Sequence, residues 1–138
     1  LFSAIMLTKG ICSKKIRQEK LNIVYISSIT SKVGNPGSLS YALTKSSLNS
    51  LVTTLSQEIG SKNIHINSVL PGAVNTEMAS MYNNNVNYDY LEKIKEKTIL
   101  KEIAKPEYIA DVILFLLSSD SYWIQGRNIV VDGGESIS

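Results

Sequence analysis

Three short runs rich in apolar and β-branched residues alternate with longer helical segments, and this alternation restricts the fold more than any other feature of the chain. The runs cover residues 22–28, 64–70 and 128–132. The first run, 22–28, is almost continuously apolar, which is typical of a strand covered on both faces. Strands that alternate with helices form a parallel sheet with helices on both sides. We therefore expect an α/β fold made of consecutive strand–helix units from a larger doubly wound parallel sheet.

Periodic apolar residues predict the helices around these strands. In the first two helices apolar side chains recur every three to four residues, and Gly60 provides a stop signal for the second. Pro106 suits the first position of the last helix, where its missing N–H group is not needed. Residues 29–39 hold turn chemistry around Asn35-Pro36-Gly37. The expected helices cover residues 1–19, 40–61, 90–100 and 106–118.

The composition is that of one globular domain. Of 138 residues, 43% are hydrophobic and 19% are charged, which is enough apolar material for a core. The net charge of +2 is too small to indicate nucleic acid or an anionic membrane as a partner. The longest apolar run, residues 112–117, is far too short for a membrane span. We therefore expect neither nucleic acid nor a membrane as a partner.

Cysteine and histidine each occur once, and this limits the chemistry that the chain can support. Cys12 alone can form neither an internal disulfide nor a cysteine metal site, so we expect no metal and a reducing, cytoplasmic compartment. We expect Cys12 to be a small apolar residue on a helix. His65 lies where a strand begins, and the chain lacks a nucleophile-elbow pattern. A hydrolase that pairs Ser28 with His65 is therefore a weak alternative.

Polar clusters follow all of the predicted strands. They are Ser27-Ser28, residues 71–76 and Asp132-Gly133-Gly134. Ligands of doubly wound sheets bind beyond the carboxyl ends of the strands. We therefore expect the functional site at this edge of the sheet. Gly133 and Gly134 are expected to permit positive φ angles at a turn.

Tyr41 and Lys45 lie one helical turn apart near the start of helix 40–61, so they share a face. A free phenol has a pKa of about 10 and exchanges protons poorly at neutral pH. A nearby ammonium group favours the phenolate, which makes the phenol a usable proton donor or acceptor. A neighbouring hydroxyl such as that of Ser28 can hold the same substrate oxygen. The Tyr-x-x-x-Lys pattern alone is weak evidence for a catalytic site. The polar clusters at the ends of the predicted strands strengthen this interpretation.

With these motifs the chain resembles the classical short-chain dehydrogenase/reductase family, most closely its members similar to 3-oxoacyl-[acyl-carrier-protein] reductases. Residues 23–28 are similar to the family's catalytic-serine strand, and Tyr41-Ala42-Leu43-Thr44-Lys45 matches its Tyr-x-x-x-Lys motif. Residues 67–76 resemble the segment that wraps the nicotinamide, and Asp132-Gly133-Gly134 fits the end of the last strand. The resemblance covers essentially the whole chain and implies the C-terminal half of a doubly wound Rossmann fold.

The resemblance implies a role for each of these residues. Tyr41 is the implied general acid/base, Ser28 holds the substrate oxygen together with Tyr41, and Lys45 favours the phenolate and hydrogen-bonds the nicotinamide ribose. The implied reaction is hydride transfer between NAD or NADP and a small-molecule carbonyl or secondary alcohol. The cofactor-binding residues implied by the resemblance are Tyr41, Lys45, Pro71, Gly72, Val74 and Thr76.

Three assignments have alternatives at this point. Ser28 is favoured over Ser27 because the thirteen-residue spacing to Tyr41 matches the family, and Ser27 is expected to face the other side of the strand. Asn67 is interpreted as strand structure rather than as a catalytic group. Residues 83–87 match a mobile segment that covers the substrate in the family, but a plain polar loop is equally consistent with their composition.

The family's glycine-rich dinucleotide loop has no match in this chain, and its catalytic Asn is expected just before Leu1. We therefore interpret residues 1–138 as the C-terminal catalytic part of one NAD(P)-binding domain, and we expect the isolated chain to be inactive. The alternative is an inactive fragment or a binding protein with the same fold. The resemblance also implies a homodimer or homotetramer, with helices 1–19 and 40–61 in one interface and the last helix and strand in another.

Overall fold

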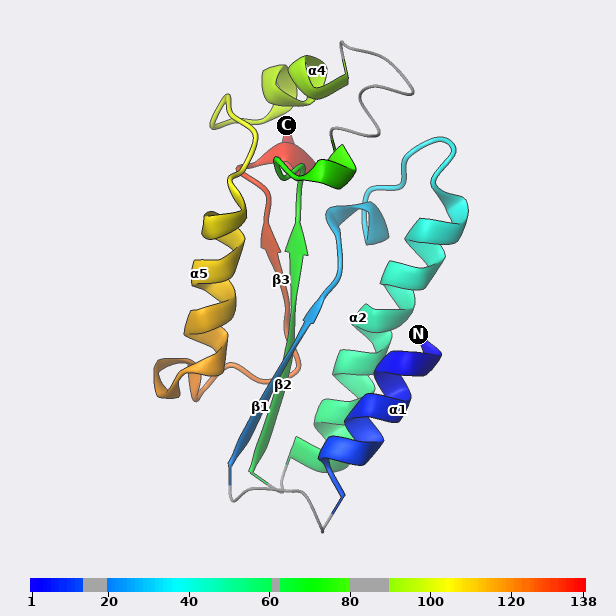
Figure 1. Cartoon of the computed structure of the whole chain (residues 1–138), viewed down its shortest axis with the longest axis vertical. Coiled ribbons are helices and arrows are strands. Elements are labelled where there is room, and N and C mark those ends of the chain that lie inside the picture. Colours follow the sequence, from blue (N-terminus) through cyan, green and yellow to red (C-terminus); the bar gives the residue numbers. More distant parts are fainter. Residues whose placement is uncertain (14–19, 61–62, 80–89) are drawn as a thin grey trace.

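The computed structural model describes residues 1–13, 20–60, 63–79 and 90–138. Its strands are parallel and form one sheet in the order β1-β2-β3 (Figure 1). They are β1 (Leu21–Ile26), β2 (Ile64–Pro71) and β3 (Asn128–Val131). Tyr25 pairs with Ser68, and Ser68 with Asn128, so the carboxyl ends of the strands lie at one edge. The predicted α/β fold with a parallel sheet is confirmed.

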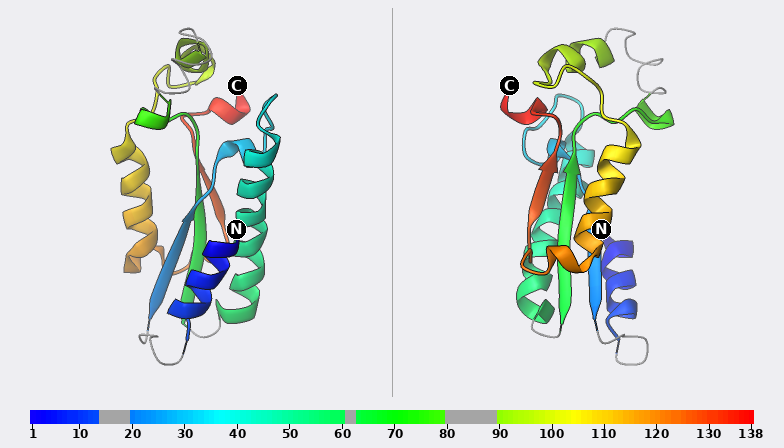
Figure 2. Two further views of the ribbon diagram at one scale, coloured as in Figure 1. Left: turned by 45° about the vertical axis from the view of Figure 1, so that its right-hand side comes forward. Right: turned by 90° about the vertical axis from the view of Figure 1, so that its left-hand side faces the viewer.

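Helices cover both faces of this sheet (Figure 2). On one face lie α1 (Phe2–Ile11) and α2 (Leu39–Ile59), and on the other lies α5 (Pro106–Leu117). A shorter helix, α4 (Tyr90–Lys97), lies beyond the carboxyl edge. Short 3₁₀ turns follow three of these elements: η1 (Ile29–Ser31) after β1, η3 (Ser119–Ser121) after α5 and η4 (Glu135–Ile137) after β3. Within the described ranges, no helix combines the length and the apolar character that a membrane crossing requires.

β2 forms the centre of the core because a neighbouring strand lies on each side of it. Ile64 and Ile66 pack with Val52 on the face that α1 and α2 cover. Val69 packs on the opposite face against Leu116 of α5. The alternation of side chains along β2 therefore fixes one helix layer on each face of the sheet.

The outer strands differ from the expectation that residues 22–28 are covered on both faces. β1 and β3 are largely half-buried because they lie at the two edges of the described sheet. Ile26, at the end of β1, is 53% exposed. β1 also ends earlier than predicted, because the backbone leaves the sheet after Ile26 and Ser28 caps the η1 turn.

The first helix is shorter than residues 1–19. α1 ends at Ile11, and Cys12 and Ser13 form a turn and a bend. Gly10 and Ser13 are weak helix formers, which explains an end at this point. Cys12 packs against the apolar cluster under α1 and α2, as expected for a small apolar side chain. Residues 14–19 lie outside the described residues, and so does the segment 83–87 that was considered as a cover for the substrate.

The remaining helices begin within one residue of the predicted positions. The predicted helix 90–100 ends at Lys97, where the Thr98 hydroxyl donates to the Ile94 carbonyl oxygen at 2.8 Å. Gly60 does follow the last residue of α2, but its φ of −61° is right-handed. The stop signal at Gly60 therefore does not act through a positive φ angle.

Two amide side chains, those of Asn67 and Gln125, connect the segment before β3 to the central strand. Asn67 is buried, and its Nδ2 donates to the Ile124 carbonyl oxygen while its Oδ1 accepts from the Arg127 N–H, both at 2.9 Å. The Gln125 side chain accepts from the Ile66 N–H at 2.9 Å and donates to the Ile64 carbonyl oxygen at 3.0 Å. These contacts support the interpretation of Asn67 as a structural residue.

We predict that Asn67→Ala lowers the free energy of unfolding of the complete protein by about 2–3 kcal/mol, because it leaves two backbone groups without their partners. Asn75→Ala is the matched control, since the Asn75 side chain is exposed; we expect it to change stability by less than about 0.5 kcal/mol. Urea unfolding measures both variants. Equal stability of the two variants would show that the Asn67 hydrogen bonds do not stabilise the fold.

Candidate active site

Ser28 is positioned by the turn that leaves the end of β1. Its backbone is extended, with φ −165° and ψ 152°, and it is the N-cap residue of η1. Its Oγ accepts from the Thr30 N–H at 3.2 Å and lies 3.2 Å from the Thr30 hydroxyl. Ser28 is buried at the carboxyl edge of the sheet. Local hydrogen bonds therefore fix the orientation of this hydroxyl before any ligand binds.

The Ser27 hydroxyl has a different hydrogen-bond partner from that of Ser28. It is buried, and its Oγ donates to the Lys45 carbonyl oxygen at 3.0 Å. This hydrogen bond ties the end of β1 to the second turn of α2. This contact gives Ser27 a structural role between β1 and α2, and the choice of Ser28 over Ser27 as the site residue stays a prediction.

Lys45 connects the end of β1 with the first turn of α2. Its Nζ donates to the Ile26 carbonyl oxygen at 2.8 Å and lies 5.6 Å from the centre of the Tyr41 ring. Burial lowers the pKa of Lys45. The Tyr41 side chain is 45% exposed, so a ligand at the carboxyl edge can reach it. The predicted pairing of Tyr41 and Lys45 on one helix face is present, and their charge and ring lie within cation–π range.

The segment after β2 follows the same edge. The Gly72 N–H donates to the Val131 carbonyl oxygen at 3.2 Å, and Val74 forms a parallel bridge with Ala104. Thr76 is exposed, and its Oγ1 accepts from the Ala79 N–H at 3.3 Å. Pro71 ends β2 and is buried. The residues expected to bind the cofactor here therefore lie at the carboxyl end of the central strand or just beyond it.

The turn after β3 has the backbone that its sequence predicts. Gly133 and Gly134 have φ angles of +61° and +87°, which residues other than glycine rarely adopt. The Asp132 carboxylate accepts from the N–H groups of Gly134 at 3.0 Å and Ser136 at 2.8 Å. Burial alone would raise the pKa of Asp132, but the hydrogen bonds from Ser136 and Gly134 hold it below its usual value.

Glu135 completes this edge and was not identified from the sequence. Its carboxylate accepts from the Ala73 N–H at 2.9 Å. Burial raises the pKa of Glu135, and the nearby Asp132 carboxylate adds to this effect, whereas the Ala73 hydrogen bond and the Lys97 charge oppose it. No spacing rule connects residues 73 and 135. The partner of Glu135 depends on the pairing of β2 with β3, which the sequence does not specify.

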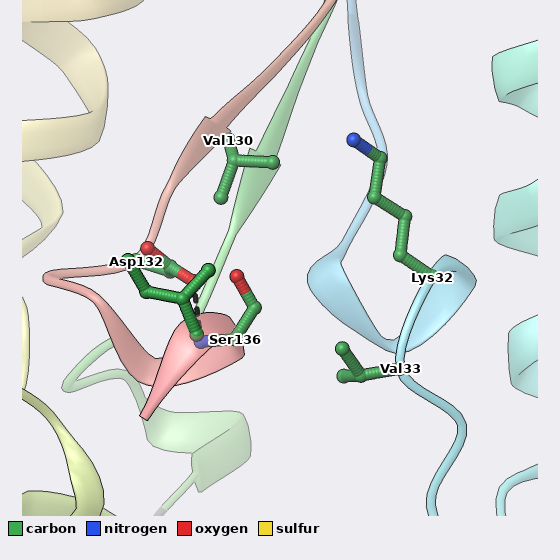
Figure 3. Close-up of a pocket in the computed structure, with 6 residues that line it drawn as sticks. Lys32, Val33, Val130, Asp132 and Ser136 are labelled. Atoms are coloured by element: carbon green, nitrogen blue, oxygen red, sulfur yellow. Dashed lines mark hydrogen bonds between the residues drawn. The ribbon is translucent and has the colours of Figure 1, made fainter.

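Two cavities lie beside this site. One of about 410 Å³ lies between η1 and the end of β3, and Figure 3 shows Lys32 and Val33 on one side of it and Val130, Asp132 and Ser136 on the other. A second, of about 160 Å³, is bounded partly by Asp132 and Glu135. Neither is lined by Ser28, Tyr41 or Lys45.

His65 lies at the other end of the sheet. It is the second residue of β2, and its ring centre is 5.2 Å from that of Tyr122. Burial lowers the pKa of His65, and the charge of Lys20 acts in the same direction. His65 is thus at the amino end of the strand, whereas Ser28 is beyond the carboxyl end of β1. This separation argues against a hydrolase that would join the two residues.

The chain is similar to known oxidoreductases. A family model described as Enoyl-(Acyl carrier protein) reductase matches residues 1–136. A 3-oxoacyl-[acyl-carrier-protein] reductase of Chlamydia trachomatis is 38% identical over 112 residues, which cover 81% of this chain and 44% of that protein. The matched part of the chain therefore spans less than half the length of this relative.

Solved structures share the fold of the whole chain. The structure of a short chain dehydrogenase family protein from Francisella tularensis is 28% identical with a TM-score of 0.89, and the match covers 100% of this chain and 59% of that one. A 4-hydroxyisoleucine dehydrogenase complexed with NADH is 30% identical with a TM-score of 0.86, and the match covers 100% of this chain and 56% of that one.

Proposed function

Because this chain belongs to the short-chain dehydrogenase/reductase family, we propose that it supplies the proton-transfer residues of an NAD(P)-dependent oxidoreductase. The reaction is hydride transfer between the nicotinamide and a carbonyl or secondary alcohol. One observation carries this proposal: the Lys45 ammonium bridges the Ile26 carbonyl oxygen at the end of β1 and the ring of Tyr41. This contact brings a cation, a phenol and the Ser28 segment to one edge of the sheet.

Proton transfer is the part of the reaction that these residues can perform. The nicotinamide, when bound, supplies or accepts the hydride at the substrate carbon. In the reducing direction Tyr41 donates its hydroxyl proton to the substrate oxygen. The Lys45 charge favours the phenolate that remains, and the Ser28 hydroxyl hydrogen-bonds the same oxygen. In the oxidising direction the Tyr41 phenolate accepts the proton of the alcohol.

The segment after β2 fits the nicotinamide end of a cofactor. A Cβ at Gly72 would lie 2.6 Å from a Glu135 carboxylate oxygen and 2.9 Å from the Asp132 Cβ, so only glycine leaves the backbone close to the β3 turn. Backbone groups of Pro71, Gly72 and Val74 with the exposed Thr76 hydroxyl would hold the nicotinamide and its phosphates. Lys45 would bind the ribose. A relative with NADH bound supports a nicotinamide cofactor, and NAD and NADP are both compatible with these residues.

The names of the relatives favour a fatty-acyl thioester as the substrate. The Chlamydia relative is a 3-oxoacyl-[acyl-carrier-protein] reductase, which suggests reduction of a 3-oxo group. The family model is described as an enoyl reductase, which makes the carbon–carbon double bond of an enoyl thioester the second candidate. For a 3-oxo group, Ser28 and Tyr41 would bind the oxygen that becomes the hydroxyl. We therefore favour the 3-oxoacyl thioester.

A substrate panel tests this proposal. The complete protein would be mixed with NADH or NADPH and with matched 3-oxoacyl and enoyl thioesters, and the absorbance of the reduced nicotinamide would be followed. We expect oxidation with the 3-oxoacyl thioester. Oxidation with the enoyl thioester alone would support the second candidate, and no oxidation with either would favour a binding protein that has lost catalysis.

We also propose that the protein is a homodimer or homotetramer. Large apolar side chains are exposed on α1 and α2, including Phe2 at 76%, Leu7 at 66% and Leu43 at 63%. Another exposed apolar group lies on α5, around Leu114 and Phe115. Apolar patches of this kind mark surfaces that pack against a partner. Light scattering of the complete protein should give a dimer or tetramer mass, and a monomer at micromolar concentration would contradict this proposal.

We further propose that the protein acts in the cytoplasm on small molecules.

A further inference from the structure

The first observation is a hydrogen bond between the end of the chain and the candidate cofactor segment. Glu135 is half-buried in η4, and its Oε2 accepts from the Ala73 N–H at 2.9 Å. Ala73 lies between Gly72 and Val74, in the segment that would hold the nicotinamide. We infer that Glu135 is a positioning residue that fixes residues 71–76 in the conformation that accepts the nicotinamide end of the cofactor. This inference rests on the proposed function.

The contact between the two segments is close on both sides of this hydrogen bond. The Gly72 N–H donates to the Val131 carbonyl oxygen at 3.2 Å, and a Cβ at Gly72 would meet the Glu135 carboxylate at 2.6 Å. The Ala73 carbonyl oxygen accepts from the Ala104 N–H at 3.2 Å. Ala73 is thus held through its N–H by Glu135 and through its carbonyl by Ala104. Removal of the Glu135 carboxylate would release one of these two restraints.

Glu135 is itself held in place by the turn before it. The Asp132 carboxylate accepts from the N–H groups of Gly134 and Ser136, on either side of Glu135. The Gly133 carbonyl oxygen accepts from the Leu100 N–H at 3.2 Å. The Glu135 carboxylate is therefore presented to Ala73 by a turn whose backbone is already fixed, so forming the hydrogen bond orders few additional groups.

The charge environment of Glu135 agrees with the role that its hydrogen bond to Ala73 suggests. A half-buried carboxylate beside a second carboxylate is unfavourable, and burial and Asp132 both raise the pKa of Glu135. Lys97 and the Ala73 N–H are the groups that oppose this effect. An apolar side chain at position 135 would avoid the desolvation of a charge. Groups with perturbed pKa values concentrate at functional sites, which agrees with a role at the cofactor segment.

Two substitutions in the complete protein separate this role from a purely structural one. Glu135→Ala removes the acceptor, and we expect the Kd for NADH or NADPH, measured by fluorescence titration, and the cofactor KM to rise about tenfold, with kcat changed by less than about twofold. Glu135→Gln retains an acceptor oxygen and should keep both values within about threefold of the wild type. Hydrogen exchange in a peptide covering residues 72–76 should accelerate in the alanine variant before any cofactor is added.

Glu102→Ala is the matched control, because Glu102 is exposed and lines the same cavity of about 160 Å³ as Glu135. We expect it to leave cofactor binding unchanged. An unchanged cofactor Kd in Glu135→Ala, an equal loss in Glu102→Ala, or an equal loss in Glu135→Gln would each overturn the inference while the wild type remains active. A wild type that binds neither NADH nor NADPH would overturn the proposed function and this inference together.

Discussion

Replacing Tyr41 by Phe should lower kcat by about 10²–10⁴-fold and leave the fold intact, because only the proton-donating hydroxyl is lost. The Tyr41 side chain is 45% exposed and belongs to neither core cluster, so stability should change by less than about 0.5 kcal/mol. The cofactor Kd should stay within about threefold of the wild type. Steady-state kinetics, circular dichroism and cofactor titration of the complete protein measure these quantities.

Tyr108→Phe provides a closely matched control for this substitution. Tyr108 also lies in the first turn of a helix, is 41% exposed, and has a lysine, Lys105, with its Nζ 5.9 Å from the ring centre. It belongs to α5, which covers the opposite face of the sheet from α2. We expect the Tyr108 variant to keep wild-type kcat. Near-normal turnover in Tyr41→Phe, or an equal loss in both variants, would remove Tyr41 from the proton-transfer step.

Replacing Lys45 by Met should lower kcat at neutral pH by about 10²-fold, because the cation that favours the Tyr41 phenolate is lost. Steady-state kinetics of the complete protein in both reaction directions measure this loss. A wild-type kcat in the Lys45 variant would show that the Lys45 charge does not act on Tyr41.

We expect the Lys45→Met variant to fold, because burial makes the charged Lys45 side chain unfavourable in the wild type. Burial lowers the pKa of Lys45 in the folded chain, so its charged form is disfavoured there. The stability linked to this group is present above the ordinary lysine pKa and is lost as the pH falls through the lowered folded value. At neutral pH methionine avoids that desolvation, which offsets part of the lost hydrogen bond to the Ile26 carbonyl oxygen. Lys105→Met is the matched control and should leave kcat unchanged.

Short-range spacing allowed the sequence to predict how the candidate residues lie relative to one another. Tyr41 and Lys45 share a helix face because four residues make about one turn, and Ser28 follows a strand that composition identifies. The parallel sheet follows from the alternation of strands and helices, and its carboxyl edge collects the polar clusters. These features depend on local periodicity, and the comparison with solved structures confirms the resulting fold.

Contacts between distant segments could not be predicted in the same way. The Lys45 partner is a backbone carbonyl of residue 26, and any residue at that position offers the same oxygen. Glu135 meets Ala73 only because β2 and β3 pair in one register. The end of α1 at Ile11 depends on weak helix formers rather than on the apolar period, which suggested a longer helix. Apolar composition also suggested full burial of β1, whereas its position at the sheet edge leaves Ile26 exposed.

A single-turnover experiment shows whether the protein transfers hydride from the reduced nicotinamide to a 3-oxo group. The complete protein, in excess over NADH or NADPH, would be mixed with a 3-oxoacyl thioester, and oxidised nicotinamide and 3-hydroxyacyl product would be quantified from the same sample. We expect equal amounts of both products in the wild type and, over the same reaction time, bound but unoxidised cofactor in Tyr41→Phe. Cofactor that binds to the wild type and stays reduced with 3-oxoacyl thioesters, enoyl thioesters and simple ketones alike would rule out hydride transfer to these substrates and favour a binding protein.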